Sequence, residues 1–441
     1  MFPKINKKRK SRNILIVAAA FFLIFAFVSV HSVHALSFPS GISNYVALNI
    51  SNSQSSATPN PFQQMINVTS SDNGWTYINT NQTTAFGENV EFFYANGTII
   101  PSWLEQYHSG YAIWWVKTGS IAANSKITIY MGFASKTTNL FNNKTTGEAP
   151  QLSSTYAEYD DGANVFTNYW NFAGTALPTG WTSLAQTDVA ITVDNGITVN
   201  NTDTTSTSLE QAAYYSTEVT PSVEDFLVTS SSFGNRNVGV GYTTSTPVTT
   251  APPPNTVEGA LGSDTNNTRA FAINSTGDVS GTTGAAVGTS GIVSTIWTNS
   301  SAVTATYNYG DATTETTDVP TYGSAYIVLM TQYSTSYTLQ WLRTRAYPPN
   351  GVMSSVTFGS VQSIAITLYL NGVSDANTSI TYGTESNFTA VSLNNYISLY
   401  VNGTKVVSLT QGKAVYLKTL AAGLYKVTAA TNAVEIKGYC Y

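Results

Sequence analysis

The sequence predicts an all-β protein, made of tandem β-sandwich domains that follow one N-terminal hydrophobic helix. Short segments of alternating apolar and polar residues recur along the chain, as in Tyr45–Ile50, Val90–Tyr94 and Lys126–Tyr130, and this alternation is typical of half-buried strands. Asn-Gly pairs at Asn371 and Asn402 indicate tight turns between such strands. The composition agrees, because 112 of the 441 residues are Ser or Thr and only 10% are charged.

The hydrophobic helix is predicted from the first 35 residues. A basic stretch at Lys4–Arg12 precedes seventeen residues, Ile14–Val30, that only Ser29 interrupts, and Val33–Ala35 resembles a small-x-small cleavage site. This order is that of a secretory signal cleaved after Ala35. Seventeen apolar residues is also the lower limit for a membrane-spanning helix, so an uncleaved signal anchor stays open. In both cases the basic end remains inside the cell and residues 36–441 are expected outside.

The charge of the exported part excludes one class of function. Six of the 19 basic residues lie in the leader, so the remainder carries 13 basic and 24 acidic residues, a net charge of −11. A nucleic-acid partner is therefore not expected, because binding needs basic surface to neutralise phosphates. The single cysteine, Cys440, excludes an internal disulfide and Cys-based metal sites.

Three domains are predicted after the leader, at residues 40–148, 150–361 and 363–441. Within the second, the Pro- and Thr-rich stretch Thr243–Thr256 is expected to form an extended, exposed loop. The third contains a hairpin signal, in which Tyr396–Val401 and Lys405–Leu409 flank Asn402-Gly403. Tyr425 follows a Gly-containing turn and resembles the tyrosine corner of Ig-like sandwiches, so this region is expected to be a reduced Ig-like module.

The first domain resembles an uncharacterised domain family that opens many archaeal and bacterial surface proteins. The resemblance implies a β domain of unknown function at the cell surface. It is carried, in a consistent order along the chain, by Tyr45–Asn52, Phe62–Val68, Val90–Tyr94, Ile100–Glu105, Ala112–Lys117 and Ile127–Phe133.

The second domain resembles a concanavalin A-like sandwich of the lectin and glucanase type. Tyr159–Gly162, Tyr169–Thr175 and Leu177–Trp181 resemble the entry strand of that fold, and Trp341–Arg345 and Val356–Gly359 resemble its closing strands. The resemblance implies a sandwich over residues 150–361, in a surface protein.

The sequence predicts no catalytic group of residues. After the leader only His108 remains, in a segment typical of a hairpin tip, and no nucleophile or orienting acid is marked for a triad. A glycosidase needs two facing carboxylates. The acidic runs Glu158–Asp161 and Val223–Asp225 do not continue to a third acid at the required spacing.

Calcium is the one cofactor that the sequence leaves open. Asp160, Asp161 and Asn164, with Glu158 nearby, form the densest group of oxygen ligands. Calcium takes six to eight oxygens, of which this group supplies about half. The alternative interpretation is a polar turn at the start of a strand.

Aromatic side chains give the candidates for sugar stacking, namely Trp103, Trp114, Trp115 and Trp170. Trp114 and Trp115 are adjacent on a predicted strand, so their side chains must point to opposite faces of the sheet. Core packing is the alternative explanation for these residues.

Asn-x-Ser/Thr sequons are the remaining motif. The twelve candidate glycosylation sites are Asn49, Asn67, Asn81, Asn96, Asn143, Asn200, Asn266, Asn274, Asn299, Asn377, Asn387 and Asn402.

Together these features predict a non-enzymatic, glycosylated extracellular cell-surface protein with a structural or adhesive role. Its expected partners are the membrane through residues 14–30, if the leader is uncleaved, and glycans or other surface proteins. The alternatives are a lectin-like carbohydrate-binding module and a glycoside hydrolase that would depend on Glu158 or Asp160.

Overall fold

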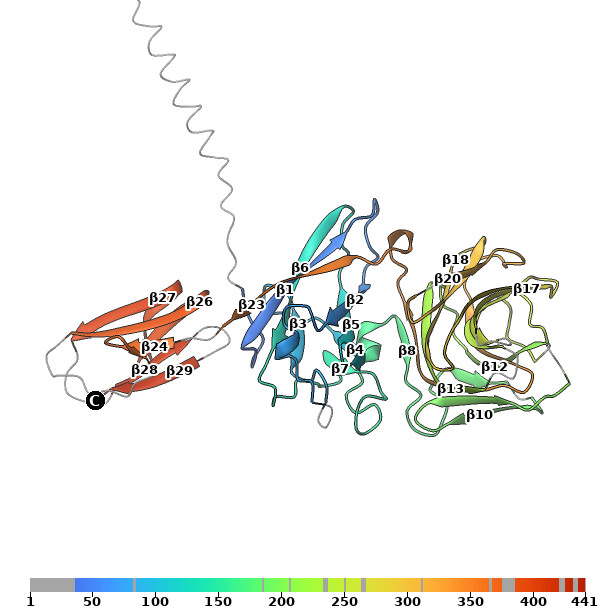
Figure 1. The fold of residues 1–441 in the computed structure, drawn as a ribbon, viewed down its shortest axis with the longest axis horizontal. Helices are drawn as coiled ribbons and strands as arrows, with labels where there is room; N and C mark the ends of the chain where they lie inside the picture. Colours follow the sequence, from blue (N-terminus) through green and yellow to red (C-terminus); the bar gives the residue numbers. More distant parts are fainter. Residues whose placement is uncertain are drawn as a thin grey trace, which may run out of the picture.

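The computed structural model of the chain (Figure 1) describes residues 36–441 apart from residues 82–84, 185, 206–207, 233–236, 250, 263–266, 311, 365–366, 375–384, 420–424, 431–434 and 441. Strands dominate this part, which confirms the all-β prediction, and its helical turns are short: η1 (Trp75–Tyr77), α2 (Gly162–Val165) and η2 (Pro349–Gly351). None of the helices described is long and apolar enough to cross a membrane. The predicted leader helix lies outside the described residues.

The first sandwich consists of two four-stranded sheets. Sheet I has the order β23-β1-β6-β3, with β23 (Ser355–Ser363), β1 (Asn44–Asn52), β6 (Ser125–Phe133) and β3 (Val90–Phe93). Sheet II has the order β2-β5-β4-β7, with β2 (Phe62–Thr69), β5 (Tyr111–Thr118), β4 (Ser102–His108) and β7 (Thr146–Glu148). Inward side chains of both sheets, among them Leu48, Trp114 and Met131, form a buried core.

Sheet I is completed by a strand that comes from the far side of the second domain. Val356–Gly359, expected as a closing strand of the second sandwich, lies in β23 and pairs with β1, where Thr357 faces Asn49. The half-buried side chains of Val356, Phe358 and Val361 pack against the first core. The second domain is therefore inserted between β7 and β23 of the first, and the domain boundary at residue 361 falls inside a strand of sheet I.

The second sandwich is larger. Sheet III has the order β10-β11-β22-β13-β18-β19-β20, with β8 on β22; its strands are β8 (Asn168–Trp170), β10 (Val189–Val193), β11 (Ile197–Asn201), β13 (Val223–Ser232), β18 (Gly291–Asn299), β19 (Ala302–Tyr307), β20 (Ala312–Glu315) and β22 (Ser336–Arg345). Sheet IV has the order β17-β16-β15-β14-β21-β12-β9, with β9 (Trp181–Ser183), β12 (Leu209–Tyr215), β14 (Asn237–Thr243), β15 (Thr256–Gly262), β16 (Asn267–Ile273), β17 (Val279–Ala286) and β21 (Tyr326–Gln332). A continuous apolar core fills the space between them. This arrangement is the two-sheet sandwich that the resemblance implied.

The Pro-rich loop after β14 differs from its prediction. Its residues are partly covered, and Pro253 is buried. The loop lies against sheet IV, where the backbone N–H of Val248 donates to Gln211 Oε1 at 3.0 Å and Asn255 bonds Ser245 within the loop at 2.9 Å. Proline has no N–H to satisfy, so such a segment can lie on a sheet at little cost in unpaired backbone groups.

The third unit is a single six-stranded sheet, sheet V, of order β25-β24-β26-β28-β29 with β27 on β26. Its strands are β24 (Thr367–Leu370), β25 (Val373–Ser374), β26 (Glu385–Val401), β27 (Thr404–Thr419), β28 (Tyr425–Ala430) and β29 (Glu435–Cys440). The predicted hairpin at Asn402-Gly403 is present, with both residues at positive φ. The Ig-like expectation of two separate sheets is not met among the described residues. Instead the pairing is irregular between Val391 and Tyr396, and side chains from both halves of β26 share one core.

Sheets I to IV are stacked as four layers. Figure 1 shows the two sandwiches side by side with β4 and β8 at their boundary, where the rings of Trp103 and Tyr169 lie 5.8 Å apart. The outer face of sheet II packs on the outer face of sheet III through an apolar cluster that includes Trp103, Ile113, Trp115, Ile292 and Trp341. Trp114 faces the first core and Trp115 faces this contact, as their adjacency predicted. We call the contact between sheets II and III the seam.

Candidate functional site at the seam between the sandwiches

The charged residues of the seam come from three strands. Trp341, Arg343 and Arg345 alternate along β22, so all three side chains leave sheet III on the face that meets sheet II. Asp225 lies on the neighbouring strand β13, directly opposite Arg343 in the register. Glu105 projects from β4 of sheet II. Strand alternation therefore brings two cations and two anions together between the domains.

Arg343 is the centre of this group. Its Nε lies 3.0 Å from Asp225 Oδ2 and its Nη2 lies 2.6 Å from Glu105 Oε2, with no exposed surface on any of the three side chains. Four aromatic rings surround the guanidinium, with centroids 4.2 to 5.1 Å from Cζ: Phe166, Trp115, Trp341 and Trp103. Arginine suits such a place because its planar cation both forks to carboxylates and stacks on rings.

Glu105 accepts hydrogen bonds from both sandwiches, and Asp225 accepts them from within the second. Glu105 Oε2 accepts from Trp115 Nε1 at 2.8 Å and from the hydroxyl of Tyr309 at 2.5 Å, as well as from Arg343. Asp225 accepts from Arg345 Nε at 2.7 Å and from Ser294 Oγ at 2.7 Å, in addition to Arg343. Glu105 thus links the two sandwiches through Arg343 and Tyr309, while Asp225 fixes both arginines on sheet III.

Electrostatics agrees with this geometry. Burial alone would raise the pKa of Asp225, but Arg345 and Arg343 hold it below its ordinary value. Burial would lower the pKa of Arg343, but Tyr309, Glu105 and Asp225 raise it above its ordinary value. Burial raises the pKa of Glu105, against the effect of Arg343. Asp225 and Arg343 thus remain charged at neutral pH.

Two side-chain amides of β2, those of Gln63 and Gln64, form hydrogen bonds with backbone groups on the other side of the seam. Gln63 of β2 donates to the carbonyl of Val165 at 3.2 Å and accepts from the backbone N–H of Ala346 at 3.0 Å. Gln64 donates to the carbonyl of Ser354 at 3.0 Å. The segment between β22 and β23 is thereby held against sheet II.

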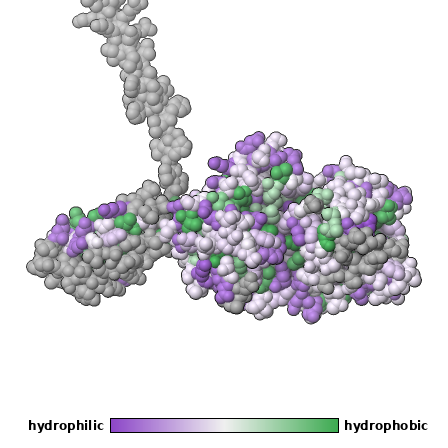
Figure 2. All heavy atoms as spheres, viewed as in Figure 1, coloured by the Kyte–Doolittle hydropathy of each residue, from purple (hydrophilic) through white to green (hydrophobic). Residues whose placement is uncertain are grey.

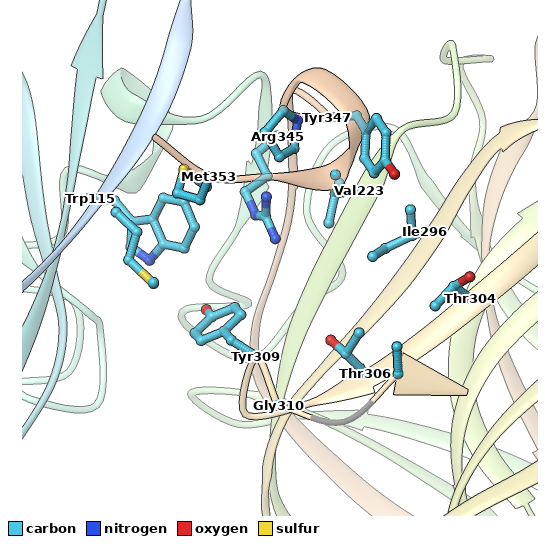
Figure 3. Close-up of a pocket in the computed structure, with 14 residues that line it drawn as sticks. Trp115, Val223, Ile296, Thr304, Thr306, Tyr309, Gly310, Arg345, Tyr347 and Met353 are labelled. Carbon is cyan, nitrogen blue, oxygen red and sulfur yellow. The ribbon is translucent and has the colours of Figure 1, made fainter. Parts of the chain in front are cut away.

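A pocket of about 390 Å³ opens beside the charged group. Figure 3 shows Trp115 and Met353 on one side of it, Ile296, Thr304 and Thr306 on the other, and Arg345 and Tyr309 between them. Its walls therefore come from both sandwiches and from the segment that returns to the first. A second opening, of about 550 Å³, lies on the other side of the β19–β20 turn and is lined by residues that include Asn67, His108, Tyr111 and Asn308.

The turn between β19 and β20 separates the two openings and carries Tyr309 into the seam. Asn308 and Tyr309 have positive φ angles of 48° and 58°, which L-residues rarely adopt, and which cost most for a bulky side chain such as Tyr. The hydroxyl of Tyr309 donates to Glu105 of the first sandwich and accepts from Arg343 Nη2 at 2.7 Å.

The calcium candidates have other roles. Asp160 Oδ1 accepts from Trp103 Nε1 at 2.9 Å and from the backbone N–H of Gly162, and its Oδ2 accepts from Asn171 at 2.7 Å, while Tyr169 bonds both oxygens. This carboxylate is therefore surrounded by hydrogen-bond donors of the protein itself. Asn164 is exposed and bonds the carbonyl of Asn143 at 3.3 Å. Among the residues the structure describes, no three His, Cys, Asp or Glu side chains are placed to hold a metal ion.

Two further acids of these acidic runs, Asp161 and Glu224, are buried. Asp161 is 1% exposed, and burial followed by the charge of Asp160 raises its pKa well above the ordinary value. Glu224 points into the interior of the second sandwich, on the opposite face of β13 from Asp225, and burial again raises its pKa well above the ordinary value. The acidic runs of the sequence therefore do not form a facing pair of carboxylates. Glu158 is exposed.

Three of the four tryptophan candidates are enclosed. Trp103 and Trp115 have no exposed surface and Trp114 has 2%, and each packs edge-on or tilted against other rings. A ring covered on both faces cannot stack on a sugar, so core packing accounts for Trp103 and Trp114. Trp115 borders the seam pocket. Trp170 is half-buried, 4.7 Å from the ring of Tyr215.

His108 and most of the sequon asparagines lie on the surface of the described part of the chain. His108 is exposed at the β4–β5 turn, as expected, with its ring 4.6 Å from that of Tyr111. Among the sequons, Asn266 and Asn377 lie outside the described residues, and Asn49, Asn200 and Asn274 are half-buried. The exposed ones are Asn67, Asn81, Asn96, Asn143, Asn299, Asn387 and Asn402.

Sequence reasoning missed Glu105, Tyr309, Arg343 and Arg345 as a group. The signal was the pattern Trp341-x-Arg343-x-Arg345, in which two cations occupy one face of a strand in a chain with few charges. A strand face with that pattern needs carboxylates opposite it, and only the fold shows that these come from β4 and β13.

Comparison with known proteins gives one sequence relative. No family model matches the chain, so the resemblance of residues 40–148 to a surface-protein domain stays a prediction. Over 129 residues the chain is 38% identical to an uncharacterised protein, 562, of Sulfolobus islandicus rod-shaped virus 1, which corresponds to 28% of this chain and 21% of that protein. The chain thus spans about a fifth of the length of the curated relative that it matches.

Among solved structures, the chain is similar to the apo Crh5 transglycosylase, at 12% identity and a TM-score of 0.29 over 42% of this chain and 86% of that one. It is also similar to the laminarinase from Rhodothermus marinus, at 8% identity and a TM-score of 0.30 over 41% of this chain and 96% of that one.

Proposed function

We propose that the chain is a non-enzymatic extracellular protein of the cell surface, with a structural or adhesive role. The observation that supports this is the seam, where the buried side chains of Glu105 and Arg343 form an ion pair that joins the two sandwiches. An interface with a buried ion pair and side-chain amide contacts favours one fixed arrangement of its domains. A rigid stack of β layers suits a protein that must present a surface outside the cell.

Location is the part of this proposal that can be tested first. The leader should either anchor the chain through residues 14–30 or be removed after Ala35, and residues 36–441 should be accessible from outside. Protease treatment of intact cells followed by mass determination of the N terminus checks both points. A mature chain that starts at Leu36 means secretion, and an intact leader means anchoring. Recovery of the intact chain in the cytosol would contradict the proposal.

Carbohydrate binding is a second candidate, and the seam pocket is the observation that favours it. The pocket combines apolar and aromatic walls with hydroxyl groups and one cation, a mixture typical of small-ligand sites. A glycan array probed with the purified full-length protein tests it. The full chain is needed because the pocket walls come from both sandwiches. An array without any bound glycan would remove this candidate and leave the structural role in place.

A further inference from the structure

The two arginines of the seam differ in what they face. Arg343 has no exposed side-chain surface, whereas 8% of the Arg345 side chain remains exposed. Arg345 directs Nε and Nη2 to the same carboxylate, Asp225, at 2.7 and 3.4 Å. Its other amino group, Nη1, makes none of the hydrogen bonds found among the described residues. Arg345 lines the pocket, and Figure 3 shows it between the two walls of the cavity, so Nη1 is the donor left for a ligand there.

The position of Arg345 is also fixed. Its guanidinium lies 4.9 Å from the ring of Trp115, on the side of sheet II, and Asp225 holds it from the side of sheet III. A cation held by a ring and a carboxylate loses little rotamer entropy when a ligand binds. Of the residues that line the pocket, Arg345 is the one that carries a charge.

The other residues that line the pocket indicate which uncharged groups a ligand would need. Met65, Trp115 and Met353 form an apolar side, and Val223 and Ile296 add apolar surface from sheet III. Thr306 and Tyr347 bring hydroxyl groups to the same cavity. Neighbouring Thr304 bonds Thr314 at 2.9 Å, so its hydroxyl is shared with the next strand. A compact molecule with one apolar face, several hydroxyls and one negative group matches these walls.

We propose that the seam pocket binds a carboxylate-bearing sugar, a uronic acid unit, with the carboxylate on Arg345 and the ring between Thr306 on one side and the half-buried side chains of Met65 and Met353 on the other. The inference rests on the carbohydrate-binding candidate and names its site and ligand class. The volume of about 390 Å³ admits one sugar ring, with room for the bond to a second. Guanidinium pairs with carboxylate through charge-assisted hydrogen bonds, which distinguish an acidic sugar from a neutral one.

Calorimetric titration of the purified protein with trigalacturonate, and with a neutral galactose trisaccharide of the same length, tests the ligand class. Galacturonate oligomers should bind about tenfold more tightly or better, because a charged hydrogen bond contributes that much. Their affinity should also fall as salt is raised. Equal affinity for the two sugars would overturn the role of Arg345. Tighter binding of a non-sugar carboxylate, for which N-acetylphenylalanine is the probe, would overturn the assignment to a sugar.

Variants locate the site. Ala312→Trp should fill the cavity from the exposed strand β20 and abolish binding, without touching the ion pairs of the seam. Thr306→Val should weaken binding several-fold while keeping the shape of the side chain. Thr229→Val, in the second opening, is the matched control and should bind as the wild type does. If the galacturonate affinity of Ala312→Trp is unchanged, the sugar binds elsewhere: the pocket assignment fails, while carbohydrate binding stands.

Discussion

Arg343 shows at the scale of one residue how this protein uses its few charges. A buried arginine is costly unless its charge is compensated, and here two carboxylates and four rings surround the guanidinium. One donor, Nη1, has no hydrogen-bond partner among the described residues. The rings of Phe166 and Trp115 provide cation–π contacts to the guanidinium.

Replacing Arg343 should therefore be severe. Arg343→Met leaves Glu105 buried without its cation, and we expect a loss of about 3 to 5 kcal/mol in the free energy of unfolding. Denaturant unfolding followed by tryptophan fluorescence measures it. The double variant Glu105→Gln with Arg343→Met should recover part of the loss, because the unpaired charge is then gone. His108→Ala, at the exposed hairpin tip, should change stability by less than about 0.5 kcal/mol. A loss below 1 kcal/mol for Arg343→Met would show that the pair is not buried.

At the scale of elements, β23 follows the second sandwich in the chain but pairs with β1 in sheet I of the first. It pairs with β1 from Asn44 to Ser51 and covers what would otherwise be an open sheet edge. Its pattern of half-buried and exposed residues is weak, so sequence alone could assign it to either sandwich. Pairing with a strand about 300 residues earlier is a long-range contact, which local patterns do not encode.

This topology makes a clear prediction about fragments. Residues 36–149 lack β23 and expose the Trp103 and Trp115 face of sheet II, so this fragment should aggregate or remain unfolded. Residues 36–363 contain both sandwiches and should be monomeric and folded. Size-exclusion chromatography with far-ultraviolet circular dichroism distinguishes the two. A soluble, folded 36–149 fragment would contradict the structural role of β23.

At the scale of the whole molecule, charged residues are few, and some of the acids lie on the surface while others are buried. Figure 2 shows a mostly pale surface with apolar residues in small groups, as expected when Ser and Thr cover the outer faces of sheets. Several carboxyls lie inside instead. Burial raises the pKa of Glu258 to about 8, and burial raises the pKa of Glu91 and Glu148 to about 7.

Stability should consequently depend on pH in a defined direction. These three carboxyls keep a proton in the folded state that the unfolded chain releases near pH 4.5, so their contribution is full below pH 4.5 and is lost as the pH rises to 7 and 8. Asp225 acts oppositely, since its lowered pKa gives stability that is lost only in strong acid. The free energy of unfolding should be highest in mild acid.

Glu258→Gln isolates one of these contributions. Both carboxyl oxygens of Glu258 lack a hydrogen-bond partner among the described residues, so the neutral amide replaces a group that burial already keeps protonated. The variant should match the wild type within about 1 kcal/mol at pH 5 and exceed its stability at pH 9 by a few kcal/mol. Denaturant unfolding at both pH values measures this difference. An identical pH dependence in the two proteins would mean that Glu258 is ionised and solvated.

Local patterns predicted much of the architecture because they depend on neighbours in sequence. The alternation at Tyr45–Ile50 and the pair Asn402-Gly403 gave a strand and a hairpin, since side-chain period and turn geometry are properties of a few residues. The opposite facing of Trp114 and Trp115 followed in the same way. The residues of sheet III that pack against Trp115 could not be predicted in this way, because their strands lie about 200 residues later in the chain.

The sequence by itself determined an all-β chain with a basic N-terminal stretch and an acidic remainder, because composition and side-chain period are local properties. Only the tertiary structure decided that β23 returns to the first sandwich, that Asp160 is bound by side-chain donors, and that Glu105, Asp225, Arg343 and Arg345 meet at one seam. These groups are far apart in the chain. Their meeting is set by sheet packing, since a buried charge is stable only where the fold brings its partner.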